Sequence, residues 1–267
     1  MNLKGKHFLT TDNWTKEELD LVFKRASDLK NQFYKEEPHL HLPWKTLFMI
    51  FFEQSTRTRN SMEAGMTQLG GHAHDLTQDK MQLSHGESAK DTAIILSRMG
   101  HGIASRNCFY GIGKGYLEEM AKHSSKPVMS LQDDVYHPFQ GLADLMTIFE
   151  KFGSDTNGLK VTVSWAYADT HSKPLSVPQT QALLFPRYGI DLTIANPKEF
   201  PLSSEIIERA EKNATIGGGS LKFTNDMNEA FEGAQIVIPK NWGGFGNYSI
   251  KEYLDNEDAC KIEMKEN

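Results

Sequence analysis

The sequence predicts an α/β protein made of two doubly wound parallel-sheet lobes. Short apolar runs of strand length alternate along the chain with longer segments of helical periodicity, which is typical of parallel sheets covered by helices on both faces. The length of 267 residues suits about two domains. The composition, with 39% hydrophobic and 24% charged residues, is that of a globular protein with a sizeable core.

The first half of the chain supplies the elements of one lobe. Thr15 and Glu18 form a capping box that begins a helix, and the continuous apolar run 46–52 predicts a central strand buried on both faces. Ser55 begins a polar turn into a further helix, which ends at Gly70. The other elements expected here are helices at 88–99, 117–123 and 138–152 and strands at 101–106 and 128–131.

The polar, glycine-containing segment 153–158 is the strongest linker signal in the chain. We therefore expect a first domain at residues 1–152 and a second domain at 153–267. The alternation restarts after this linker. It predicts strands at 161–165, 192–195, 221–223 and 236–238, helices at 178–188 and 203–213, and a short element at 227–231.

Charge and cysteine content exclude several classes of function. The net charge of −6 lacks the basic excess that contacts to a phosphate backbone require, so we expect no nucleic acid partner. Two cysteines form neither a disulfide framework nor a cysteine-rich zinc site, and they fit a reducing compartment. No apolar stretch is long enough for a membrane span, and the N-terminus lacks the apolar core of a signal peptide. We expect a cytoplasmic protein without membrane contact.

Residues 55–59, with the sequence STRTR, are the sharpest candidate site. They follow a buried strand at the start of a helix, where unpaired backbone N–H groups and the helix dipole favour an anion. Three hydroxyl groups add donors, and Arg57 and Arg59 add guanidinium groups that fork onto phosphate. A capped helix with two surface arginines is the alternative interpretation, but the density of donors favours an anion site.

Further polar residues lie at two other strand ends. His137 and Gln140 follow the strand at 128–131 and lie one helical turn apart, and His137 could donate to a carbonyl oxygen. Arg106 lies at the end of the preceding strand. Singly, His137 fits a helix cap or a packed residue and Arg106 a surface residue, and the pair of His137 and Gln140 gains weight only if it faces the 55–59 turn. Pairs of histidines at 39 and 41 and at 72 and 74 lack a third metal ligand, so we expect loop histidines and no metal.

STRTR after an apolar strand, an arginine at 106 and HPFQ at 137–140 together resemble the aspartate and ornithine carbamoyltransferase family. QLSHGES at 82–88 is similar to the family loop that reaches into a neighbouring subunit's site, and GLAD at 141–144 continues the HPFQ helix as in family members. Residues 164–165, 173–178 and 239–242 are similar to a branch whose backbone is knotted in the second lobe. The resemblance covers residues 2 to about 250.

This resemblance implies a carbamoyl phosphate-binding first domain and an amino-acceptor second domain. Gln82 would reach the adjacent subunit's site, which implies a homotrimer with shared active sites, and Arg59 would support the turn. Neither a metal nor a cofactor is implied, because carbamoyl phosphate is already activated. The residues implied to hold carbamoyl phosphate are Ser55, Thr56, Arg57, Thr58, Gln82, Arg106, His137 and Gln140, and those implied as catalytic are Arg57, Thr58, Arg106, His137 and Gln140.

The acceptor side of the site is less defined. Trp165, Lys240 and Trp242 are its candidates, with Lys240 contacting an acceptor carboxylate, although a solvated lysine at a strand end explains Lys240 equally well. The HCLP-type motif, the last helix and the Asp-x-x-x-Ser-Met-Gly loop of relatives are not found, so we expect a C-terminally incomplete second domain.

We therefore expect an enzyme that carbamoylates an amino acid or an ornithine-like derivative. The alternative is a catalytically silent homologue that acts as a phosphate-binding or scaffold subunit. A nicotinamide dehydrogenase would need a GxGxxG motif after a strand, and the first strand of the second lobe leads into AYADT instead.

Overall fold

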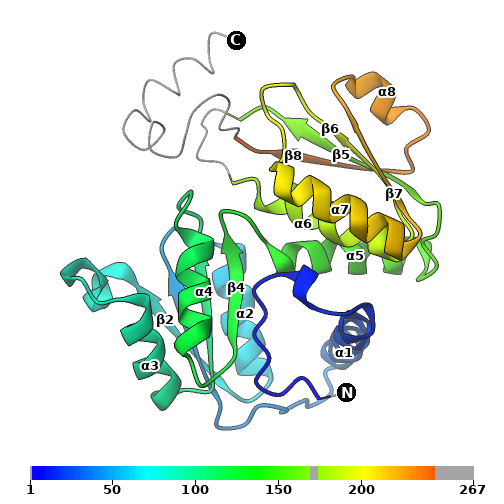
Figure 1. The fold of residues 1–267 in the computed structure, drawn as a ribbon. Coiled ribbons are helices and arrows are strands. Elements are labelled where there is room, and N and C mark those ends of the chain that lie inside the picture. The colour runs from blue at the N-terminus through cyan, green and yellow to red at the C-terminus, as the bar shows by residue number, and fades with distance from the viewer. Residues whose placement is uncertain (1, 169–173, 244–267) are drawn as a thin grey trace. The chain divides into compact units, whose positions relative to one another are not determined.

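The computed structural model describes residues 2–168 and 174–243, which form two α/β units (Figure 1). The first unit contains residues 2–108 and 112–133, and the second contains residues 109–111 and the described residues from 134 onward. Each unit has a four-stranded, wholly parallel sheet with flanking helices, so the predicted fold class is confirmed. The helix at 138–152 belongs to the second unit, and the domain boundary expected after it stays a prediction.

The first sheet has the strand order β2-β1-β3-β4. These strands are β1 (Thr46–Phe51), β2 (His72–Thr77), β3 (Gly102–Asn107) and β4 (Val128–Asp133). The chain leaves β1 toward β2 and leaves β3 toward β4, in opposite directions, so the topological switch point lies between β1 and β3. Open α/β sheets bind ligands beyond the carboxyl ends of the strands at such a point.

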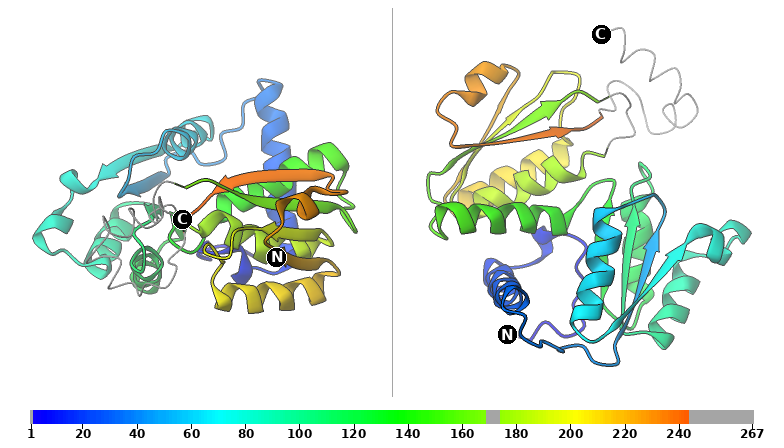
Figure 2. Two further views of the ribbon diagram at one scale, coloured as in Figure 1. Left: turned by 90° about the horizontal axis from the view of Figure 1, so that it is seen from above. Right: turned by 180° about the vertical axis from the view of Figure 1, so that it is seen from behind.

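Helices cover both faces of this sheet and explain the apolar run in β1. Phe48 and Ile50 share a buried cluster with Ala93 and Leu117. These partners come from α3 (Ala89–Met99) and α4 (Gly113–His123), whereas α2 (Arg57–Gln68) lies on the opposite face (Figures 1 and 2). The prediction of a central strand buried on both faces is therefore confirmed.

The N-terminal segment carries a short 3-10 helix, η1 (Thr11–Asn13), before helix α1 (Lys16–Tyr34). Thr15 and Glu18 form the expected capping box at the start of α1. Two further 3-10 helices, η2 (Gln78–Lys80) and η3 (Gln82–His85), connect β2 to α3.

The second sheet has the strand order β7-β6-β5-β8. Its strands are β5 (Lys160–Ala166), β6 (Asp191–Ala195), β7 (Ser220–Thr224) and β8 (Ile236–Asn241). The chain leaves β5 toward β6, while β8 pairs with the other side of β5, so the switch point lies between β5 and β8. Its helices are α5 (Pro138–Phe152), α6 (Ser176–Leu184), α7 (Ser204–Gly217) and α8 (Met227–Phe231), with η4 (Phe185–Tyr188) after α6.

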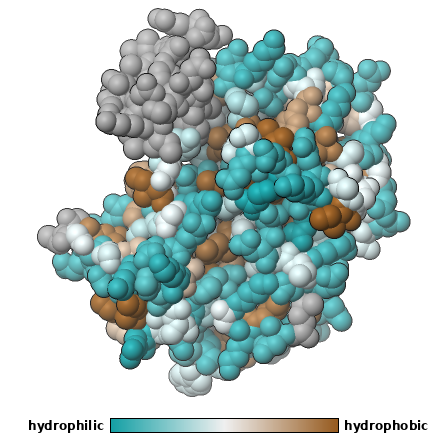
Figure 3. Space-filling view, in the orientation of Figure 1, coloured by the Kyte–Doolittle hydropathy of each residue, from teal (hydrophilic) through white to brown (hydrophobic). Residues whose placement is uncertain are grey.

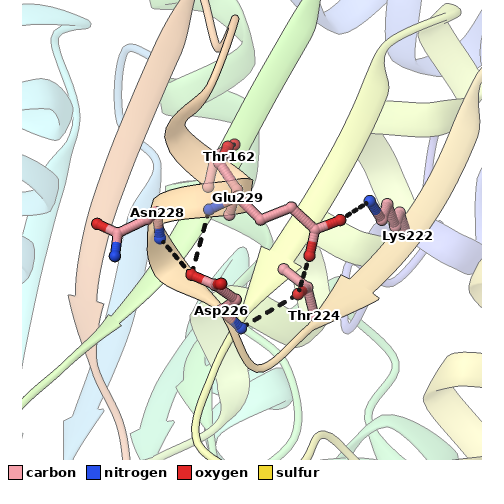
Figure 4. Close-up of polar contacts among 7 residues, drawn as sticks. Thr162, Lys222, Thr224, Asp226, Asn228 and Glu229 are labelled. Carbon is pink, nitrogen blue, oxygen red and sulfur yellow. Dashed lines mark hydrogen bonds and ion pairs between the residues drawn. The ribbon is translucent and has the colours of Figure 1, made fainter.

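Polar contacts hold the short helix α8 against the strands (Figure 4). Asp226 accepts hydrogen bonds from two backbone N–H groups of the first turn of α8 at 2.9 and 3.2 Å. Glu229 accepts a hydrogen bond from Thr224 at 2.8 Å and pairs with Lys222, both of β7. Thr162 of β5 donates to a carbonyl oxygen of α8 at 2.7 Å. These contacts fix the turn through which the chain returns into β8.

The surface facing the viewer in Figure 3 is mostly hydrophilic, with apolar side chains in small groups. Large apolar side chains such as Phe51, Phe185 and Leu145 are fully buried. Among the described residues, no helix is both long and apolar enough to cross a membrane.

Three of the differences from the sequence prediction are instructive. The edge strand β2 was not expected, because its sequence HAHDLT is polar and partly exposed and lacks an apolar run. Helix α4 begins at Gly113 and not at 117. Its first turn was not predicted to be helical, because it is rich in glycine, which has low helix propensity. The helix expected at 178–188 becomes 3-10 helical after Leu184. Part of the expected knotted loop, residues 169–173, and the chain end from 244 lie outside the described residues.

Candidate active site

The 55–59 turn leads from β1 into α2 at the switch point of the first sheet. Thr56 is the N-cap residue of α2, and its side chain makes no capping hydrogen bond. The positive end of the helix is therefore not neutralised by its own N-cap side chain, and an anion can take that place.

Arg106 lies at the carboxyl end of β3, where it pairs in register with Phe51 of β1. Its Nη1 atom is 3.4 Å from Oγ1 of Thr58 in the first turn of α2. The structure thus brings Arg106 to the 55–59 turn. The pairing of β3 with β4 shifts register between Ser105 and Arg106, and such irregularities re-aim a side chain beside functional sites.

The two arginines of the turn have different surroundings. Arg59 forms an ion pair with Asp75 of β2, and its guanidinium carbon lies 4.1 Å from the centre of the Phe51 ring. These contacts attach α2 to the sheet and agree with the structural role expected for Arg59. Arg57 is exposed, and within residues 2–168 and 174–243 no hydrogen bond or ion pair engages it. Its guanidinium group is therefore accessible from solvent.

Glu53 lies beside Arg106 and was not a candidate in the sequence. Its Oε1 accepts a hydrogen bond from the backbone N–H of Cys108 at 2.6 Å, and its Oε2 lies 3.9 Å from Nε of Arg106. Burial raises the pKa of the Glu53 carboxyl, although the Cys108 N–H and the Arg106 charge act to lower it. Its position two residues before the STRTR motif, at the same strand end, was the available signal.

Gln82 is the first residue of η3, and its side chain is exposed. Ser88 caps the following helix α3 by accepting a hydrogen bond from the Asp91 N–H at 3.1 Å. Gln82 therefore lies on the surface of the first unit, in the loop that precedes α3, and its side chain is accessible from solvent.

His137 and Gln140 lie at the start of α5 in the second unit. His137 is the N-cap residue and is buried, and its backbone N–H donates to Oγ1 of Thr180 on α6 at 2.9 Å. A Cβ atom at Gly141 would lie only 2.6 Å from Cγ2 of Thr180. Glycine at 141 therefore allows the close approach of α5 and α6 that sets the position of His137.

Gln140 is exposed, and its Nε2 donates to Oδ1 of Asp144 at 2.8 Å, one turn along α5. The other carboxylate oxygen, Oδ2, accepts a hydrogen bond from Nε2 of Gln181 at 2.7 Å. Burial raises the pKa of the Asp144 carboxyl, while both amide donors act to lower it. Neither Asp144 nor Gln181 was a candidate in the sequence, although the spacing of four residues between Gln140 and Asp144 was a signal.

Trp165 and Lys240 are register partners at the carboxyl ends of β5 and β8, at the switch point of the second sheet. The Trp165 ring stacks on Phe200 with a centroid distance of 4.8 Å, and its indole N–H donates to the Trp242 carbonyl at 2.8 Å. The Lys240 ammonium donates to both oxygens of Asn241.

Trp242 is completely buried, and its indole N–H donates to the carbonyl oxygen of Phe200 at 3.0 Å. Its side chain therefore packs inside the second unit, and its assignment to the acceptor stays a prediction. Two histidines also differ from expectation, since His72 and His74 lie on strand β2 and not in a loop.

Two family models match the chain. The model of the carbamoyl-P binding domain of aspartate/ornithine carbamoyltransferases matches residues 6–150, and the model of their Asp/Orn binding domain matches residues 163–265. The chain belongs to the aspartate/ornithine carbamoyltransferase family.

Relatives within this family differ in length from the chain. The chain is 35% identical over 258 residues to YgeW of Escherichia coli K12, which is named a putative carbamoyltransferase. The match covers 91% of this chain and 65% of YgeW. The chain is also 35% identical over 250 residues to the ornithine carbamoyltransferase of Sulfurisphaera tokodaii, with 94% of this chain and 78% of that protein covered.

Solved structures of carbamoyltransferases have the same fold. The ornithine carbamoyltransferase from Pyrococcus furiosus gives a TM-score of 0.85 at 31% identity, covering 99% of this chain and 78% of that chain. An N-acetyl-L-ornithine transcarbamylase variant, complexed with carbamyl phosphate and N-succinyl-L-norvaline, gives a TM-score of 0.85 at 28% identity, covering 98% of this chain and 81% of that chain.

Proposed function

We propose that the protein transfers the carbamoyl group of carbamoyl phosphate to the amine of an amino acid or an ornithine-like derivative and releases phosphate. The observation that carries this proposal is the contact of Arg106 with Thr58 at the N-terminus of α2, where the N-cap side chain makes no capping hydrogen bond. Arg57 lies in the same turn and forms no hydrogen bond or ion pair with any described residue. Relatives named ornithine carbamoyltransferase, and a solved relative complexed with carbamyl phosphate, support the same chemistry.

The phosphate half of the reaction is assigned to the first unit. Ser55, Thr56 and Thr58 offer hydroxyl donors, and Arg57 and Arg106 offer permanent positive charge. Negative charge on the departing phosphate grows during the transfer, so donors that are already in place stabilise the transition state more than the substrate.

The carbamoyl half is assigned to His137 and Gln140, together with Arg57 and Thr58. An unprotonated amine attacks the carbonyl carbon, and charge develops on the carbonyl oxygen before the bond to phosphate breaks. One well-placed donor to that oxygen contributes about 3 kcal/mol of barrier lowering. The leaving phosphate can accept the proton of the amine, so the chemistry makes no demand for a side-chain base, a metal or a cofactor.

The remaining assignments concern the acceptor and the assembly. We assign Trp165 and Lys240 to the acceptor, because they lie at the switch point of the second sheet, with Lys240 offering a cation to a carboxylate. We assign Gln82 to the site of a neighbouring subunit in a homotrimer, which its exposed position in the first unit allows. A knotted second lobe and a cytoplasmic location stay predictions from the sequence.

A panel assay tests the proposal. Purified protein is incubated with carbamoyl phosphate and with ornithine, N-acylated ornithines, aspartate or diamines, and the ureido product is measured. We expect product with at least one amine. Binding of carbamoyl phosphate without product from any amine would contradict the proposal and favour the alternative of a silent homologue.

A further inference from the structure

The carboxylate of Asp144 lies between two carboxamides. It accepts hydrogen bonds from Nε2 of Gln140 at 2.8 Å and from Nε2 of Gln181 at 2.7 Å, one on each oxygen. Gln140 comes from the same helix, and Gln181 comes from the neighbouring helix α6 within the second unit. The two contacts together fix the carboxylate against both helices.

A carboxylate can only accept hydrogen bonds, so both amides must turn their NH₂ groups toward it. Gln181 follows this requirement even though its own Oε1 is buried and has no hydrogen-bond partner among the described residues. An unpartnered buried carbonyl oxygen is costly, which indicates that the contact with Asp144 sets the orientation of Gln181.

The same requirement applies to Gln140, which is exposed at the first turn of α5. Because an amide is planar, holding its Nε2 against Asp144 directs its Oε1 away from the carboxylate. Gln140 therefore offers a ligand an oriented hydrogen-bond acceptor, Oε1, beside the second N–H of its NH₂ group. The carbamoyl group of the proposed substrate has one donor, its NH₂, and one acceptor, its carbonyl oxygen.

We propose that Asp144 is a positioning residue that holds Gln140 with Oε1 outward, so that Gln140 accepts a hydrogen bond from the NH₂ of the carbamoyl group, while Gln181 holds Asp144. This inference rests on the proposed function.

The test replaces Asp144 with asparagine, which keeps the shape but adds a donor and removes the charge. Asp144→Asn then tolerates Gln140 in either orientation. The affinity for carbamoyl phosphate, measured by titration calorimetry, should fall by roughly 10-fold, while the affinity for inorganic phosphate, which lacks the NH₂, should change less than about 2-fold. Where an amine is turned over, kcat/KM for carbamoyl phosphate should fall at least as much.

A double-mutant cycle separates positioning from general support of the fold. In the Gln140→Ala background, Asp144→Asn should have no further effect, because there is no amide left to orient. The matched control is Asp226→Asn, the same substitution at a carboxylate that contacts α8, and it should leave both affinities unchanged. Melting temperatures of all variants report whether they fold.

Three results would overturn the inference: an unchanged carbamoyl phosphate affinity in Asp144→Asn, an equal loss of affinity for phosphate, or an equal effect of Asp144→Asn with and without Gln140. Failure of the proposed function is separate, since it would appear as wild-type protein that binds carbamoyl phosphate but carbamoylates no amine. Wild-type protein that does not bind carbamoyl phosphate would overturn both.

Discussion

The two switch points of the molecule are built differently. At the first, between β1 and β3, the candidate anion site is formed by the 55–59 turn, one continuous segment, together with Arg106. At the second, between β5 and β8, the candidates Trp165 and Lys240 are 75 residues apart by number and become neighbours through the pairing of their strands. The proposed anion site rests on a helix N-terminus and adjacent arginines, which are local properties, whereas the proposed acceptor site depends on side chains that only the fold brings together.

The sharpest test of the first region compares its two arginines. Arg57→Ala should reduce turnover at least 100-fold, to an extent typical of losing a main transition-state donor, and should abolish measurable binding of carbamoyl phosphate, with an unchanged melting temperature. Arg59→Ala is the matched control. Because Arg59 pairs with Asp75 and stacks on Phe51, its loss should cost about 1 kcal/mol of stability but leave binding intact. Near-normal kinetics of Arg57→Ala would place the anion site elsewhere.

The second region is tested by Lys240→Met, which removes the cation but keeps much of the side-chain volume. We expect KM for the acceptor to rise about 10-fold, the loss of one charge-assisted hydrogen bond, while KM for carbamoyl phosphate stays constant. Steady-state kinetics with each substrate varied in turn measure both values. Lys198→Met, at an exposed position of the same unit, is the control. An unchanged acceptor KM would mean that Lys240 is a solvated lysine at a strand end.

The packing behind His137 should be sensitive to a single methyl group. Gly141→Ala places a Cβ atom 2.6 Å from Cγ2 of Thr180, so α5 and α6 must separate. Overpacking of this kind costs about 1–3 kcal/mol of unfolding free energy. Chemical denaturation measures this loss, and Gly115→Ala on α4, where a Cβ atom meets nothing within 4 Å, is the control. Equal stability of the two variants would show that the helices accommodate the methyl group.

The smallest expected effect concerns Glu53, whose carboxyl pKa is raised by burial. A group with a higher pKa in the folded protein than in the unfolded chain stabilises the fold when protonated, and this stabilisation is lost as the pH rises through the folded pKa. Glu53→Gln is neutral at every pH. The free energy of unfolding of Glu53→Gln minus that of wild type should therefore increase as the pH rises from about 4 to 7, which means that the variant becomes relatively more stable. Denaturation at both pH values measures the difference, and a change in the opposite direction would contradict the burial argument.

The fold was predictable where burial leaves a local pattern. The apolar run of β1 and the capping box at Thr15 were sufficient, whereas β2 was missed because an edge strand needs no continuous apolar run. At the candidate site, the 55–59 turn and Arg106 were found from their positions at strand ends. Glu53 and Gln181 were missed, because a carboxylate in a turn and an amide in a buried helix acquire partners only when distant segments meet.

Carbamoyl transfer at the 55–59 turn of the first unit is the proposed activity. Its most direct test is ¹³C NMR of a reaction with carbonyl-labelled carbamoyl phosphate and the amine panel. We predict that a ureido carbon signal grows together with free phosphate in the presence of wild-type protein and is absent with Arg57→Ala. A wild-type reaction in which label is lost only at the rate of the protein-free blank would contradict the claim.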